Sequence, residues 1–93
     1  MATSLKRNPQ TPNMEWWTGS VTASATFRSA SGRPVKAVHA LAHSSTHPSG
    51  NNHADKFSWV PDVNNASKFV LYCWKDAGTA AAATTITISV QTA

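Results

Sequence analysis

"TGSVTASATFR", residues 18–28, alternates apolar and polar side chains over its last eight positions. One set of alternate positions holds Val21, Ala23, Ala25 and Phe27, and the other holds Thr22, Ser24, Thr26 and Arg28. Successive side chains of a β-strand point to opposite faces of a sheet. This period of two therefore predicts one strand with a buried face and a solvent-exposed face.

Four more runs of strand-forming residues follow, separated by turns rich in Ser, Gly, Pro and Asn. They cover residues 34–43, 56–60, 68–75 and 84–91. The runs 34–43 and 68–75 are partly apolar on both faces, which predicts central strands. The last run is amphipathic, and its aliphatic side chains are predicted to point inward: Ile86, Ile88 and Val90.

Five strands joined by short turns favour an all-β fold, a small antiparallel β-sandwich or barrel. Residues 1–15 differ, because Pro9 and Pro12 disfavour a helix and the segment has no apolar period. It also has too few apolar side chains to pack on its own domain. We therefore expect residues 1–15 to form an extended N-terminal arm and residues 16–93 to form a single β-sandwich domain.

The predicted core is thin for a chain of 93 residues. The sequence contains three Leu, two Ile and seven Val, against 15 Ala and 22 Ser and Thr. A domain this small buries a modest share of its surface, and sharing a core between subunits compensates for that. We therefore expect a homo-oligomer.

The composition also argues against several classes of function. Eight basic and four acidic residues give a net charge of +4, but the basic residues are dispersed and only Lys6 and Arg7 are adjacent. A nucleic-acid-binding protein more typically gathers them on one face, so we expect no nucleic-acid partner. No apolar run approaches the ~20 residues of a membrane span, and residues 1–13 lack the apolar segment of a secretory signal. Cys73 is the only cysteine, so no intramolecular disulfide can form.

All four histidines fall between residues 39 and 53. A metal site within one chain would need His47 and His53 with a carboxylate such as Asp55, yet their spacing matches no zinc motif. We expect solvated loop histidines, no metal and no cofactor. A trimer could still bring three copies of one histidine together at its axis.

The sequence contains no recognisable catalytic set. Cys73 lies in the most apolar run, where a free thiol is usually a small buried hydrophobe. Three of the four acidic residues stand beside predicted turns, where Asp commonly caps the backbone. We therefore expect no enzymatic activity.

Trp16 and Trp17 are adjacent at the start of the predicted domain. Neighbouring residues of a strand point to opposite faces, so one of the two indoles should remain outside the core and pack against another chain. An exposed indole could instead form a platform on which a sugar stacks. We take Lys6, Arg7, Trp16 and Trp17 as candidate contacts to a subunit or partner.

Two segments, "ATFRSASGRPVKAVHAL" (25–41) and "KFVLYCWKDAG…TTITISV" (68–90), resemble the H-type lectin domain. That resemblance implies a homotrimer of β-sandwiches that binds surface glycans. Trp74 matches the tryptophan near the family's sugar site, and Arg33 or a histidine is its candidate partner there. The next position is a histidine in the family and Lys75 in this chain.

The short β domain with its arm also resembles small virion proteins of tailed bacteriophages, namely capsid decoration proteins and fibre tips. This resemblance implies a non-enzymatic structural protein that is made in the host cytoplasm and resides in the virion. Because Met1 is followed directly by the short arm, we expect a small complete gene product, which favours decoration over a fibre tip. The arm, with Lys6 and Arg7, would add a strand to an edge of the major capsid protein or another virion protein.

Overall fold

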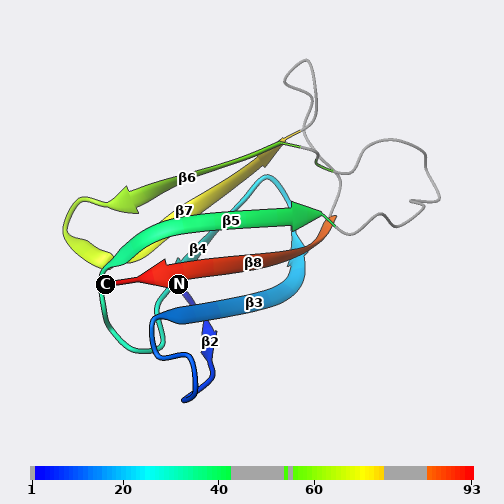
Figure 1. The fold of residues 1–93 in the computed structure, drawn as a ribbon. Helices are drawn as coiled ribbons and strands as arrows, with labels where there is room; N and C mark the ends of the chain where they lie inside the picture. The colour runs from blue at the N-terminus through cyan, green and yellow to red at the C-terminus, as the bar shows by residue number, and fades with distance from the viewer. Residues whose placement is uncertain (1, 43–53, 55, 75–83) are drawn as a thin grey trace.

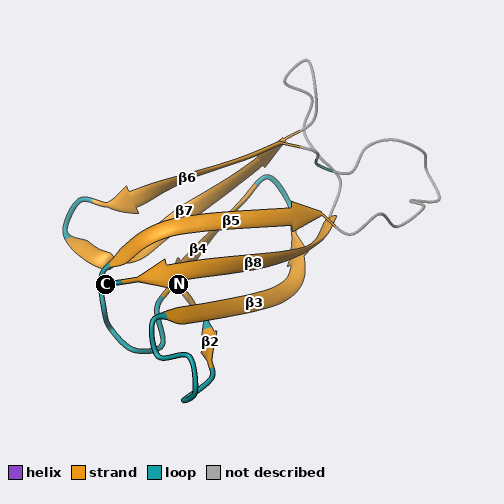
Figure 2. Cartoon of the chain, in the orientation of Figure 1, coloured by secondary structure: helices purple, strands orange, loops and turns teal. Residues whose placement is uncertain are grey.

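The structure is a computed structural model that describes residues 2–42, 54, 56–74 and 84–93. In these residues, eight β-strands form two four-stranded sheets packed as a sandwich (Figures 1 and 2), which confirms the predicted fold class. The strands are β1 (Thr3–Ser4), β2 (Lys6–Arg7), β3 (Met14–Val21), β4 (Ser24–Arg28), β5 (Val35–Ala42), β6 (Lys56–Asp62), β7 (Asn65–Trp74) and β8 (Thr84–Thr92). No helix in the described part of the chain could span a membrane.

One sheet has the order β1-β4-β7-β6 and the other has the order β2-β3-β8-β5. All the pairings are antiparallel except that of β1 with β4. β7 lies between β4 and β6, so the prediction that residues 68–75 form a central strand is confirmed for the residues in β7. The amphipathic pattern of the last strand is also confirmed, because Ile86, Ile88 and Val90 are fully buried.

The alternating stretch 18–28 is two strands, and the prediction of one continuous strand is wrong. β3 ends at Val21, β4 begins at Ser24, and the two strands belong to different sheets. The chain changes sheet at Ala23, whose φ of 64° lies in the left-handed region. Val21 and Phe27 are both buried on either side of this corner. The apolar and polar residues therefore alternate across the corner without interruption, and the alternation gives no sign of the change of sheet.

β5 is an edge strand of its sheet, so the prediction that residues 34–43 form a central strand is also wrong. Its inner face contains Val38 and Ala40, which are half-buried, while Leu41 on its outer face is 61% exposed. A shift in register between Val35 and Ala37 changes the alternation at the start of the strand. The second apolar face of β5 therefore points to the surface.

Residues 3–7 are extended, as predicted, but they pack on their own domain. β1 pairs with β4 and β2 pairs with β3, so this short segment joins both sheets. Leu5, between the two strands, is 3% exposed, and its N–H donates to the carbonyl of Arg28 at 2.9 Å. The expectation that the arm lacks the apolar side chains to pack on its domain is wrong, because one leucine fills the seam between the sheets.

The core lies between the sheets and is centred on three rings. Phe27 stacks on Phe69 with ring centroids 5.5 Å apart, and Trp17 meets Phe27 edge-on at 4.9 Å. Gly19 leaves room for the Trp17 indole, since a Cβ at that position would clash with it. The buried apolar residues are Leu5, Val21, Phe27, Ala54, Phe69, Leu71, Cys73, Ile86, Ile88 and Val90.

Candidate functional site

The outer face of the β2-β3-β8-β5 sheet presents large apolar side chains to solvent. Met14 and Trp16 on β3 are 45% and 43% exposed, and Leu41 on β5 is 61% exposed. The strand between them, β8, contributes only short or polar residues to this face. We call this surface the exposed sheet face and define it by Met14, Trp16, Thr18, Ala37, His39, Leu41, Thr87, Ser89 and Gln91.

The strand register arranges the exposed sheet face in rows. Trp16 and His39 both pair with Ser89, so the indole and the imidazole flank a serine. In the next row Thr18 and Leu41 both pair with Thr87, and the hydroxyls of the two threonines are 3.0 Å apart. The large side chains therefore stand along the two sides of the face, with a lower polar strip between them.

Trp16 and Trp17 occupy opposite faces of β3, as predicted. Trp17 packs against the core, whereas Trp16 lies on the exposed sheet face. The Lys6 ammonium on β2 lies 5.4 Å from the centre of the Trp16 ring, within the range of a cation–π contact. Of the four candidate contacts, Lys6, Arg7 and Trp16 are exposed and Trp17 is largely covered.

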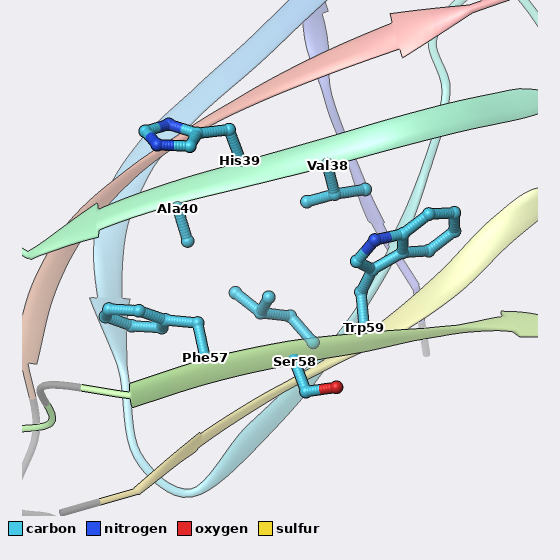
Figure 3. Close-up of a pocket in the computed structure, with 7 residues that line it drawn as sticks. Val38, His39, Ala40, Phe57, Ser58 and Trp59 are labelled. Atoms are coloured by element: carbon cyan, nitrogen blue, oxygen red, sulfur yellow. The ribbon is translucent and has the colours of Figure 1, made fainter.

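A groove of about 240 Å³ lies between the edge strands β5 and β6 (Figure 3). Val38 and Ala40 point into it from β5, and Phe57 and Trp59 point into it from β6 (Figure 3). His39 and Ser58 also line the groove, but their side chains point away from it. β5 therefore contributes its inner face to an apolar groove and its outer face to the exposed sheet face.

Glu15 is a structural residue that sequence reasoning did not single out. Its carboxylate is buried on β3 and accepts hydrogen bonds from the N–H of Ala30 at 2.5 Å, the N–H of Ser31 at 3.3 Å and the hydroxyl of Ser31 at 2.6 Å. These bonds tie the 29–33 turn to β3. The only signal for this role in the sequence was the position of Glu15 two residues before Trp17. Residues two apart in a strand share a face, so the carboxylate lies on the inward face with the indole.

The two candidate sugar contacts, Trp74 and Arg33, are not brought together. Arg33 follows the turn at Ser29, whose N–H donates to the carbonyl of Ser67 near the start of β7. Trp74 ends β7, seven residues further, or about 23 Å along the strand. The tip of β7 and the start of β5 accordingly lie at opposite ends of the sandwich (Figure 1). The Arg33 guanidinium donates instead to Asn13 Oδ1 at 2.7 Å.

Of the four histidines, the described residues include one. His39 is exposed on β5, and the other three, with His47 and His53 among them, lie outside the described residues, as does Asp55. Within the described ranges, no three His, Cys, Asp or Glu side chains come close enough to hold a metal ion. The expectation that His47 and His53 bind no metal therefore stays a prediction.

Cys73 is a buried thiol, as predicted, with 3% of its surface exposed. Burial raises the pKa of the thiol above its ordinary value of 9.0, and a hydrogen bond with the Ala23 backbone acts in the opposite direction. The thiolate is the reactive form, so the folded state suppresses both access and ionisation.

We therefore expect Cys73 to react with a thiol-specific disulfide reagent at pH 8 about a hundredfold more slowly in buffer than in urea. The raised pKa contributes stability that is fully present below pH 9 and is lost as the pH rises through the folded pKa, because the unfolded thiol ionises first. A Cys73→Ala variant should lack this alkaline loss. Equal labelling rates in buffer and urea would contradict the burial.

Comparison of the chain with protein-family models, characterised proteins and solved structures finds no match. Evidence about function therefore comes from the surface chemistry of the chain. In the described part of the chain, the strand register places Trp16, Ser89 and His39 in one row of the exposed sheet face.

Proposed function

We propose that the protein is a non-enzymatic virion structural protein, a bacteriophage capsid decoration protein that binds the capsid surface as a homo-oligomer, most simply a trimer. The observation that supports this proposal is the exposed sheet face, where Met14, Trp16 and Leu41 are each more than two-fifths exposed. Large apolar side chains exposed on both sides of a flat sheet face, with polar groups between them, suit a protein interface.

The face has the composition of an interface rather than of a reaction site. Trp16 can act as a buried anchor, since tryptophan is enriched among the residues that contribute most to binding. The short side chains of β8, such as Ser89, allow a flat partner to approach closely. Lys6 beside Trp16 adds positive charge, which suits an acidic partner surface.

The way in which the protein would attach differs from the sequence expectation. Residues 3–7 already pair with β3 and β4, so they are not free to add a strand to a neighbour. We place the contact on the exposed sheet face, with Lys6 and Arg7 at its margin. The edge of β5 adjoins this face and offers backbone groups for pairing with a partner strand.

Replacing Trp16 with Ala tests this surface. We expect the variant to fold with a stability change below about 1 kcal/mol, because the indole is half-exposed. Association should weaken by about 2 kcal/mol, or about thirtyfold in Kd, if Trp16 is an interface anchor. Sedimentation velocity at micromolar concentration measures self-association, and co-sedimentation with capsids of the encoding phage measures attachment.

Tyr72 provides the matched control. It is an aromatic residue of nearly the same exposure, 45% against 43% for Trp16, on the outer face of the other sheet. Tyr72→Ala should leave oligomerisation and attachment intact. A well-folded wild-type monomer that does not bind capsids would refute the proposal. Loss of association in Tyr72→Ala but not in Trp16→Ala would move the interface to the other sheet.

The second candidate function is a carbohydrate-binding fibre-tip or adhesion module. The half-exposed Trp16 indole, with Ser89 beside it and His39 on the far side of that serine, favours it, because an aromatic platform with polar neighbours suits a sugar ring. A glycan array separates the two functions. Binding that is lost in Trp16→Ala or Trp74→Ala while the fold persists supports the lectin function, and an array without binding supports the structural function.

A further inference from the structure

A polar pocket of about 350 Å³ lies where β4 and β7 meet the 29–32 turn. Arg28 from β4 and Lys68 from β7 line it, together with Ser4 from β1 and Asn65. It is separate from the exposed sheet face, because these strands belong to the other sheet. The pocket therefore combines two cations with neutral polar groups.

Arg28 and Lys68 stand directly opposite each other in the antiparallel pairing of β4 with β7. The neighbouring residues Ser29 and Ser67 form a hydrogen-bonded pair, since the Ser29 N–H donates to the Ser67 carbonyl at 2.9 Å. Because hydrogen-bonded pairs alternate with non-hydrogen-bonded pairs, Arg28 and Lys68 occupy a non-hydrogen-bonded pair, in which side chains are closer. Two like charges at such a position repel each other and destabilise the sheet.

The described acidic residues near the pocket, Glu15 and Asp62, bond to neutral groups and not to these two cations. Both carboxylate oxygens of Glu15 accept hydrogen bonds from Ala30 and Ser31. Asp62 Oδ1 accepts a hydrogen bond from the N–H of Asn64 at 2.8 Å. Within the described residues, neither Arg28 nor Lys68 forms an ion pair with an acidic group. In the described part of the chain, the Arg28 guanidinium and the Lys68 ammonium therefore have no direct carboxylate partner.

The surrounding polar groups leave room for a ligand with acceptor oxygens. Asn65 Oδ1 accepts from both the N–H and the hydroxyl of Ser67, so only the amide nitrogen of Asn65 remains to donate. The Ser29 hydroxyl donates to the Arg33 carbonyl. The groups that could meet a ligand are the Arg28 guanidinium, the Lys68 ammonium and the Asn65 amide, and all three are donors.

We propose that this pocket binds a single oxyanion, held between Arg28 and Lys68. The guanidinium presents two parallel N–H donors that match a carboxylate or a phosphate, and the ammonium adds a second charge-assisted bond. The bound oxyanion separates and neutralises the two cations. Inorganic phosphate and the carboxylate of an acidic segment of a partner protein share this chemistry.

Backbone amide shifts of the full-length protein, recorded at constant ionic strength in chloride buffer, test the site. One titration uses inorganic phosphate, and a second uses the amide of acetylated triglutamate. We expect saturable shifts confined to residues 28–32 and 65–68 in at least one titration. Saturation by phosphate alone identifies a free anion as the ligand, and saturation by the peptide alone identifies a carboxylate of an acidic segment.

Lys68→Glu separates binding from folding. This change gives Arg28 an opposite charge on the facing strand, so the variant should melt at a higher temperature than the wild type in chloride buffer. Its affinity for the oxyanion should fall at least about tenfold, because a charge-assisted bond is lost and a repulsive charge is added. Arg28→Gln should also lower the affinity, without the rise in melting temperature.

Lys36→Glu is the matched control, because it makes the same change of charge at an exposed position of β5. It should leave the oxyanion titration unchanged. Shifts that spread over the whole surface without saturating, or an equal loss in Lys36→Glu, would overturn the proposal. Trp16→Ala should bind the oxyanion with the affinity of the wild type. The oxyanion titration therefore tests the pocket alone, whereas the association experiments test the exposed sheet face.

Discussion

Removal of residues 1–7 is expected to destabilise the sandwich by about 3–5 kcal/mol. The main cause is the loss of Leu5, which is 3% exposed and packs in the core between the two sheets. The truncation also leaves the backbone edges of β3 and β4 without the strands that pair with them. Leu5→Ala alone should account for most of the effect, because deletion of a buried leucine side chain costs 2–5 kcal/mol.

Urea unfolding followed by circular dichroism measures the loss, which corresponds to about 4–8 °C in melting temperature per kcal/mol for a domain of this size. Arg7→Ala serves as the control, because Arg7 is exposed and should change the stability by less than about 0.5 kcal/mol. If the truncated chain were as stable as the full chain, residues 1–7 would be the free arm that their composition predicted.

Glu15→Ala should lower the free energy of unfolding by about 3 kcal/mol. This loss is comparable to that of the truncation, but it comes from polar contacts. Glu15 is 1% exposed, and its removal leaves two N–H groups and one hydroxyl of the 29–33 turn without their acceptor. Hydrogen bonds to a charged group contribute about 1.5–3 kcal/mol each, and a buried donor without a partner adds its own desolvation cost. Glu15→Gln should lose less, because its amide oxygen can still accept from the Ala30 N–H.

Urea unfolding and hydrogen exchange at Ala30 and Ser31 measure this effect together. Both amides should exchange faster in Glu15→Ala, since their acceptor is gone. The control is Asp62→Ala, where an exposed carboxylate holds only the turn at Asn64 and the loss should stay below about 1 kcal/mol. Unchanged exchange at Ala30 and Ser31 would show that Glu15 does not order the turn.

The sequence predicted the class of fold because period-two alternation directly records which face of a strand is buried. It could not locate the corner at Ala23, because Val21 and Phe27 stay in phase through the change of sheet. The edge position of β5 was hidden for a related reason. Leu41 is apolar, and an apolar outer face looks the same in the sequence whether another strand, another chain or water covers it.

Of the candidate sites, adjacency alone predicted the division of Trp16 and Trp17 between two faces. The pairing of Arg28 with Lys68 needed the register of β4 on β7, since 40 positions separate the two residues in the chain. The separation of Arg33 from Trp74 likewise follows from the direction of β7. The role of Leu5 depended on the seam between two sheets, which a local pattern of residues cannot describe.

The place of β8 in its sheet has a consequence for how the chain folds during synthesis. β8 is made after all the other described strands, yet it lies between β3 and β5 and pairs with both. Pairings such as Met14 with Gln91 join positions far apart in the chain, and closing such long loops slows folding. A nascent chain that stops before residue 84 holds β3 and β5 without the strand that joins them, so unpaired edges stay open to aggregation on the ribosome.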